Sequence, residues 1–250
     1  MAERPIRYKK APIAEAILAV RFATEVDAVA LTKAVAERLG ESFGSTGQDR
    51  MWFEISVAAD GQGVRTSVAH RLDARMLSSP DGHWRLTVGR GIVAMHALPP
   101  YDGWQSLRSM AETVLGHCLT ARVGSPLAGV AVRYIDRVSL PPDSQLGDYF
   151  EVAPGWPAGL PGQASGFLTQ IRSADEERGL EATLTLATGP QVKAGWPEVL
   201  YDLQVGFSSP QATVSAENWA LLADELHEMQ RTIFEQTITP RLRALLEPEW

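Results

Sequence analysis

The sequence predicts an α+β protein in which a twisted, mostly antiparallel sheet packs one face against three helices, the last being the longest. Short runs of alternating apolar and polar residues, separated by glycine-rich turns, indicate antiparallel strands. Two other segments carry apolar residues at intervals of three and four, and a third has near-helical spacing, which is typical of amphipathic helices. This order of elements suits a single domain over residues 1–250, or two related halves, 1–125 and 126–250.

The first half of the chain predicts two hairpins and two helices. Asp27 is expected to cap the first helix, and Gly40 to end it. Pro99-Pro100 breaks the chain, and a second helix is expected after Asp102, with an apolar seam that reaches Cys118. The strands expected here are 12–22, 51–58, 64–72, 84–88 and 92–98.

The second half predicts further strands and the clearest helix. Residues 141–166 hold five prolines and are expected to form a long surface connection. A helix should begin at Ser215, and Thr239-Pro240 predicts that it breaks and restarts. Leu221 and Phe234 widen the apolar face of this helix beyond what one sheet contact needs, which favours dimerisation as an addition. The strands expected here are 127–140, 167–173, 180–187 and 199–207.

Composition bounds the class of protein. With 45% hydrophobic and 21% charged residues, the chain of 250 residues is globular rather than disordered or fibrous. No apolar run approaches the ~18 residues of a membrane span. Residues 1–10 carry early charges without a following apolar stretch, so we expect a cytoplasmic protein without a secretory signal. The single cysteine, Cys118, cannot form an internal disulfide, and the net charge of −7 argues against nucleic acid as a partner.

No group of residues in the sequence indicates a catalytic site. We expect neither a G-x-S-x-G nucleophile elbow nor an H-E-x-x-H motif. Cys118 lies on the apolar seam of its helix, where a buried, unreactive thiol is expected. If Gly89-Arg90 is a two-residue turn, His83 lies opposite His96, with Cβ atoms about 5 Å apart. Neither histidine has a carboxylate or cysteine at a recognisable ligand spacing. We therefore expect no catalytic residue, cofactor or metal, although an enzyme such as a hydrolase or nuclease remains a third hypothesis.

Charge is distributed unevenly along the chain. Residues 61–98 hold five arginines and two aspartates, a local charge of +3, whereas residues 215–250 have a charge of −4. Arginines along hairpins can converge on a phosphate or on the carboxylates of a partner. Alternatively, they pair with the acidic helix of the same fold or are solvated.

Four phrases in a fixed order resemble a sporadically distributed bacterial family of about this length, one without an assigned activity. They are APIAEAI at Ala11–Ile17, LPPYDGW at Leu98–Trp104, VRYIDRVSLP at Val132–Pro141, and Leu226-His227 followed by IFEQTIT at Ile233–Thr239. The resemblance runs nearly end to end and implies no catalytic residues. The scattered distribution of the family implies mobile genes, such as those of phage-defence or toxin–antitoxin clusters.

The sequence therefore predicts a non-enzymatic cytoplasmic accessory or regulatory protein that binds another protein, or a second copy of itself. The alternative is a small-ligand or nucleotide sensor with an arginine-lined pocket on the sheet. Membrane and nucleic acid are not expected as partners. A strand with two arginines and an acid must pair or expose them, so the candidate binding residues are Arg65, Arg71, Arg85, Arg90, Arg133, Tyr134, Asp136 and Arg137.

Overall fold

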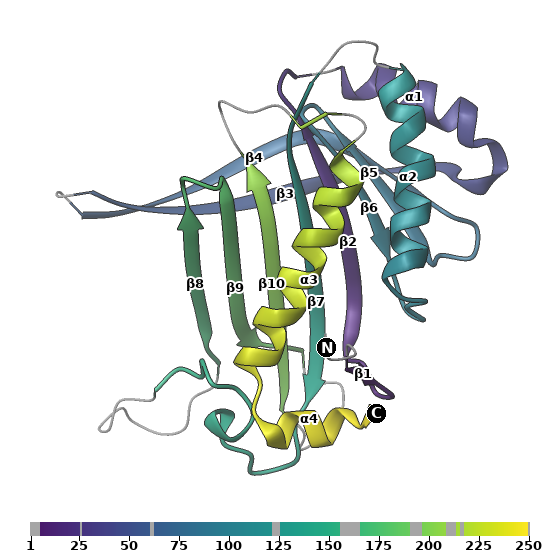
Figure 1. The fold of residues 1–250 in the computed structure, drawn as a ribbon. Helices are drawn as coiled ribbons and strands as arrows, with labels where there is room; N and C mark the ends of the chain where they lie inside the picture. The colour runs from purple at the N-terminus through teal and green to yellow at the C-terminus, as the bar shows by residue number, and fades with distance from the viewer. Residues whose placement is uncertain are drawn as a thin grey trace. The chain divides into compact units, whose positions relative to one another are not determined.

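A computed structural model of the chain confirms the α+β class with an antiparallel sheet (Figure 1). The structure describes residues 6–25, 27–60, 63–121, 126–155, 166–190, 197–208, 214–215 and 218–249, with the backbone alone described for 29, 44–60, 63–73 and 119–121. The chain divides into two compact units. Unit 1 consists of residues 1–17, 130–209 and 220–250, and unit 2 of residues 18–129 and 210–219.

Unit 2 combines a run of antiparallel hairpins with two helices. Its strands follow one another in the hydrogen-bonded order β3-β4-β5-β6-β2. The elements are β2 (Ile13–Phe22, which enters this unit at Leu18), α1 (Ala28–Leu39), η1 (Gly40–Ser42), β3 (Gly44–Asp60), β4 (Gly63–Ser78), β5 (Trp84–Gly89), β6 (Ile92–Ala97) and α2 (Trp104–Ala121). The strands of the first hairpin are longer than the sequence predicted.

Local sequence explains both helices of unit 2. The Asp27 side chain accepts a hydrogen bond from the Ala30 N–H, with N and Oδ1 3.2 Å apart, and Gly40 adopts a φ of +57° where α1 ends. Glycine tolerates this left-handed conformation without steric cost. The predicted seam of α2 is buried and includes Leu107, Val114 and Cys118, each fully inaccessible to solvent.

The β5–β6 hairpin turns one residue later than the sequence suggested. Val88 pairs with Val93 and Arg85 with His96, so the two-residue turn is Arg90-Gly91 and not Gly89-Arg90. The prediction that His83 lies opposite His96 is therefore wrong. The His83 ring hydrogen bonds to the Pro99 carbonyl (Nδ1–O 3.1 Å), whereas the buried His96 ring bonds the Thr87 hydroxyl (Nε2–Oγ1 2.9 Å).

Unit 1 contains the strands of the second half of the chain. Their hydrogen-bonded order is β2-β7-β10-β9-β8, and a separate pair of short strands joins residues near the two ends of the chain. Tyr8 pairs there with Pro248. The elements are β1 (Arg7–Tyr8), β7 (Leu127–Ser139, in this unit from Val130), η2 (Leu146–Asp148), β8 (Leu168–Asp175), β9 (Leu180–Thr188), β10 (Glu198–Ser208), α3 (Trp219–Thr237), α4 (Pro240–Leu246) and β11 (Pro248–Glu249).

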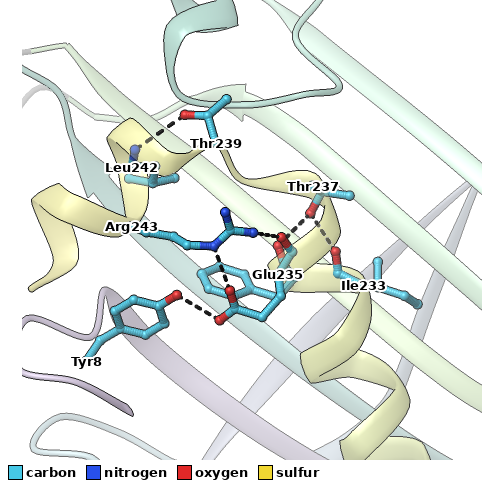
Figure 2. Close-up of polar contacts among 8 residues, drawn as sticks. Tyr8, Ile233, Glu235, Thr237, Thr239, Leu242 and Arg243 are labelled. Carbon is cyan, nitrogen blue, oxygen red and sulfur yellow. Dashed lines mark hydrogen bonds and ion pairs between the residues drawn. The ribbon is translucent and has the colours of Figure 1, made fainter. Parts of the chain in front are cut away.

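The C-terminal region is two helices rather than one long helix. α3 has 19 residues against 18 in α2, and the chain restarts as the seven-residue α4 at the predicted Thr239-Pro240. A polar network fixes this corner (Figure 2). Glu235 accepts from the Tyr8 hydroxyl (O–Oε1 2.7 Å) and from Arg243 (Nε–Oε2 2.9 Å), and Arg243 also donates to the Glu235 carbonyl.

The predicted surface connection over residues 141–166 is partly buried. Tyr149 and Phe150 are 2% and 1% exposed, and Phe150 forms an isolated antiparallel bridge with Ile238. The prolines predicted a loop correctly. The long-range bridge between Phe150 and Ile238 that buries part of this loop has no local signal in the sequence. Residues 156–165 lie outside the part of the chain that the structure describes.

Candidate interaction surface

Alternate residues of β7 and β10 point to opposite faces of the unit 1 sheet. On one face the Tyr201 hydroxyl lies 2.7 Å from that of Thr237 in α3, and Figure 1 shows α3 crossing β7 and β10. We call this the covered face. The opposite face, here the polar face, is defined by Arg133, Arg137, Glu198, Asp202, Thr185 and Gln170.

A row of polar side chains crosses four strands on the polar face. Arg133 of β7 forms a bidentate ion pair with Asp202 of β10, with Nε–Oδ1 and Nη2–Oδ2 distances of 2.7 and 2.5 Å. Asp202 pairs in register with Thr185 of β9, which pairs with Gln170 of β8. The Gln170 amide donates to the Thr185 hydroxyl at 3.1 Å. The fork geometry of the first pair fixes both side chains in place.

Arg137 also lies on the polar face, beside a buried acid. Its Nε is 3.9 Å from Oε1 of Glu198, whose side chain is 5% exposed, whereas that of Arg137 is 52% exposed. Glu198 Oε1 has no hydrogen bond to any described residue. We expected each arginine of this strand to be paired or exposed, and both are. Arg133 is paired, and Arg137 presents half its side chain to solvent.

Tyr134 and Asp136 occupy the covered face of the same strand, away from the two arginines. The Tyr134 hydroxyl is 3.3 Å from Nδ1 of His227 in α3, and burial lowers the pKa of His227 to about 4, with help from the Arg231 charge. Asp136 is 3% exposed, and its Oδ1 has no hydrogen-bond partner among the described residues. Burial, followed by the negative charge of Asp202, raises the pKa of Asp136 to about 7. These two candidates are interior groups. The expectation that the acid of this strand is paired or exposed is therefore wrong for Asp136.

The hairpin arginines belong to unit 2. Arg85 is half-buried on β5, and Arg90 lies in the following turn with Nη1 3.8 Å from Oε2 of Glu25. Arg65 and Arg71 pair in register with Ala58 and Trp52 of β3, but their side chains lie outside the described part of the structure. Of the eight candidate residues, the structure thus brings Arg133 and Arg137 to one face, without showing a common pocket for the hairpin arginines.

Sequence reasoning missed the β8 edge, defined as Leu168–Asp175. β8 is the last strand in the hydrogen-bonded order, with β9 as its neighbour, and all its residues except Thr169 are exposed. Leu168 is 71% exposed and Ile171 46%. They lie on opposite faces of the strand because their separation is odd. The segment LTQIRSAD thus lacks a consistent apolar face. This pattern in the sequence could have indicated that the strand is exposed on both faces.

The backbone of the β8 edge also has a defined orientation. The Thr188 N–H donates to the Phe167 carbonyl at 3.0 Å, so Phe167, just before β8, points its polar backbone groups toward β9. In an antiparallel ladder such residues alternate with residues whose N–H and C=O point outward. The outward set in β8 is therefore Leu168, Gln170, Arg172 and Ala174.

The one cysteine of the chain is not an activated nucleophile. Cys118 is fully buried, as predicted, and burial raises the pKa of its thiol to about 12. Gly40-Glu-Ser-Phe-Gly44 has the G-x-S-x-G spacing of hydrolase elbows, so the expectation that this spacing is absent is wrong. It runs from α1 into β3, whereas a nucleophile elbow leads from a strand into a helix.

Among the described residues no group of three or more His, Cys, Asp or Glu is placed to hold a metal ion. None of the described helices is both long enough and apolar enough to cross a membrane. No protein-family model matches the chain, and no curated protein is significantly similar to it.

Proposed function

We propose that this chain acts by binding another protein, whose extended segment adds as a strand to the β8 edge. The observation that carries this proposal is an eight-residue strand at the end of a sheet in which every residue except Thr169 is exposed. Strand addition uses main-chain hydrogen bonds for affinity and alternate side chains for specificity. It requires no catalytic group.

The β8 edge offers both kinds of contact. Its outward N–H and C=O groups are a template for a further strand, which proteins usually shield with proline, bulges or a covering segment. The strand LTQIRSAD has no proline, and its one basic and one acidic residue are Arg172 and Asp175. Leu168 and Ile171 would contact the incoming strand on its two faces, and Arg172 with Asp175 would fix its register by charge.

The polar face extends this surface beyond the edge. Gln170 ends the polar row that begins at Arg133, so a partner on β8 meets side chains already held by hydrogen bonds. Rigid polar groups lose little conformational entropy on binding. In this proposal the chain is a cytoplasmic accessory or regulatory protein, consistent with its single cysteine and with the mobile gene clusters that the family resemblance implies.

A matched pair of substitutions at Gln170 tests the proposal. Gln170→Pro removes one outward N–H while leaving the β9 ladder intact, and Gln170→Ala removes the same side chain but keeps the N–H. We expect proteins retained from cell extract by the immobilised chain to persist with Gln170→Ala and to fall about tenfold with Gln170→Pro, a loss of about 1.4 kcal/mol. Quantitative mass spectrometry measures retention, and sedimentation velocity detects self-association by the same pair.

Amide hydrogen exchange locates the contact. Bound partner should slow exchange at Leu168, Gln170, Arg172 and Ala174, whose N–H groups are otherwise free to exchange with water. Equal retention by the two Gln170 variants, or protection that does not include β8, would contradict strand addition at this edge.

A further inference from the structure

Unit 2 contains an open cleft of about 800 Å³, remote in sequence from the β8 edge. Three segments line it: the end of α1 with η1, the connection between β4 and β5, and one face of α2. The α2 face is formed by Ser106, Ser109, Met110 and Thr113, which recur at helical spacing. Small-molecule sites commonly have volumes of about 300–1,000 Å³, so this cleft has the size of a ligand site.

The charged residues that line the cleft are all acidic. Glu41 and Asp81 are the charged residues among those that line the cleft, and no lysine, arginine or histidine is present in this set. Glu41 is exposed and makes no hydrogen bond or ion pair with a described residue. No described lysine or arginine forms an ion pair with either carboxylate, although the charge of His83 acts on Asp81. The excess of negative charge favours a positively charged ligand.

Asp81 is held in a fixed position. Its Oδ1 accepts a hydrogen bond from the Ser79 hydroxyl at 2.5 Å and from the His83 N–H at 3.0 Å. These bonds lower the pKa of Asp81, with the Ser79 bond contributing most, so the group stays ionised at neutral pH. Its Oδ2 makes no hydrogen bond with a described residue and remains available to a ligand.

Apolar side chains complete the lining. Phe43 is 3% exposed, and Trp84 is half-buried in the first position of β5. Met110 contributes a polarisable thioether from α2. An indole ring attracts a cation over its face, and the attraction strengthens where water is excluded. The combination of two carboxylates with aromatic and thioether surface suits an ammonium group attached to an apolar body.

We propose that the cleft between α1, α2 and the β4–β5 connection binds a small organic amine. Glu41 and Asp81 contact the ammonium group, and Trp84, Phe43 and Met110 contact the apolar body. The hydroxyl groups of Ser106 and Ser109 provide additional acceptors for ammonium protons. This binding is independent of the β8 edge and persists if strand addition fails.

Phenethylamine is a direct probe, because it joins one ammonium group to one aromatic ring. Its binding to the full chain is measured by saturation-transfer NMR and calorimetry, beside phenylacetate and phenethyl alcohol. We expect the amine to bind, the two analogues to bind at least about tenfold more weakly, and higher salt to weaken the amine. A capped Phe-Lys dipeptide serves as the peptide-borne form of the same chemistry.

Charge-neutral substitutions identify the site. Glu41→Gln with Asp81→Asn keeps side-chain size and the Oδ1 acceptor of the turn, and should weaken phenethylamine about tenfold or more. Glu177→Gln, an exposed position in the β8–β9 turn, is the control and should leave affinity unchanged. Glu41→Gln alone, at an exposed site, serves if the double variant unfolds. The proposal fails if no amine binds, if the neutral or anionic analogue binds equally, if only the dipeptide binds, or if these variants retain full affinity.

Discussion

The carboxyl group of Asp136 lies on the covered face of the unit 1 sheet. Its burial there changes the pH range in which the group is protonated. It is 3% exposed, and burial raises its pKa to about 7. In the unfolded chain an aspartate titrates near pH ~4. Between these two values the folded protein therefore binds a proton that the unfolded chain has released.

This difference predicts the direction of a pH dependence. A pKa raised by folding makes stability fall as pH rises from about 4 to about 7, and stay level above that range. Asp136→Asn keeps the shape of the neutral carboxyl group but cannot ionise. Relative to the parent, the variant should gain stability across this range, by on the order of 3–4 kcal/mol at pH 8 compared with pH 4.

Urea unfolding at several pH values between 4 and 8 measures the effect. The difference between the two proteins isolates Asp136, because His227, whose pKa falls to about 4 on burial, titrates in both. Asp143→Asn is a matched control at an exposed position, where φ is +61° and asparagine is well tolerated. Parallel stability curves for Asp136→Asn and its parent would show that the buried carboxyl group does not titrate in this way.

For single charged residues, the sequence predicted that a charge is either paired or exposed, but it did not predict which residue forms the pair. The rule that two arginines and one acid on a strand are paired or exposed describes Arg133 and Arg137 but is wrong for Asp136, which is buried without a partner for Oδ1. The partner of Arg133 is Asp202, 69 residues away on β10. Only strand order brings these residues together, and that order is set by tertiary packing that local patterns do not encode.

The corner between α3 and α4 shows a helix start defined by one side chain. The Thr239 hydroxyl accepts the Leu242 N–H at 3.4 Å and donates to the Asp148 carbonyl at 2.6 Å. It therefore satisfies one free N–H group of α4 and joins the helix to η2. The Thr-Pro pair indicated this restart correctly, because a capping hydroxyl followed by proline at the first helical position is a local signal.

Thr239→Ala should destabilise the protein by about 1–2 kcal/mol, since it removes an N-cap and leaves a carbonyl without its donor. Thr239→Ser retains the hydroxyl and should lose less than half as much. The midpoint of urea unfolding measures both effects, provided that the slope of the unfolding free energy against urea concentration is the same in each protein. If serine and alanine cost the same, the hydroxyl group does not provide the stabilisation, and the threonine methyl group does.

Elements with strong periodicity were predictable, and elements fixed by long-range contacts were not. The seam of α2 repeats over several turns, and its burial follows from that pattern alone. The β5–β6 turn was misplaced by one residue because glycines flank Arg90 on both sides and both two-residue turns satisfy the local chemistry. The exposure of β8 depends on its place at the end of the strand order, which the sequence does not display.

At the scale of the whole molecule, unit 1 is assembled from separated parts of the chain. Residues 1–17 join residues 130–209 and 220–250. Tyr8 pairs with Pro248 and donates its hydroxyl to Glu235, and the Pro12 carbonyl accepts the Arg137 N–H at 2.8 Å. A boundary at residue 126 would divide these contacts between two fragments, leaving buried and half-buried polar groups unpaired.

Two fragments of unit 1 test this organisation. Residues 130–250 alone lack the first segment and should give a poorly dispersed amide NMR spectrum. The same fragment followed by a Gly/Ser linker and residues 1–17 should give a dispersed one, because the β1–β11 pairing places residue 7 beside residue 249. Equal dispersion would mean that the N-terminal segment is dispensable. Failure of both fragments would mean that unit 1 depends on the rest of the chain for its core.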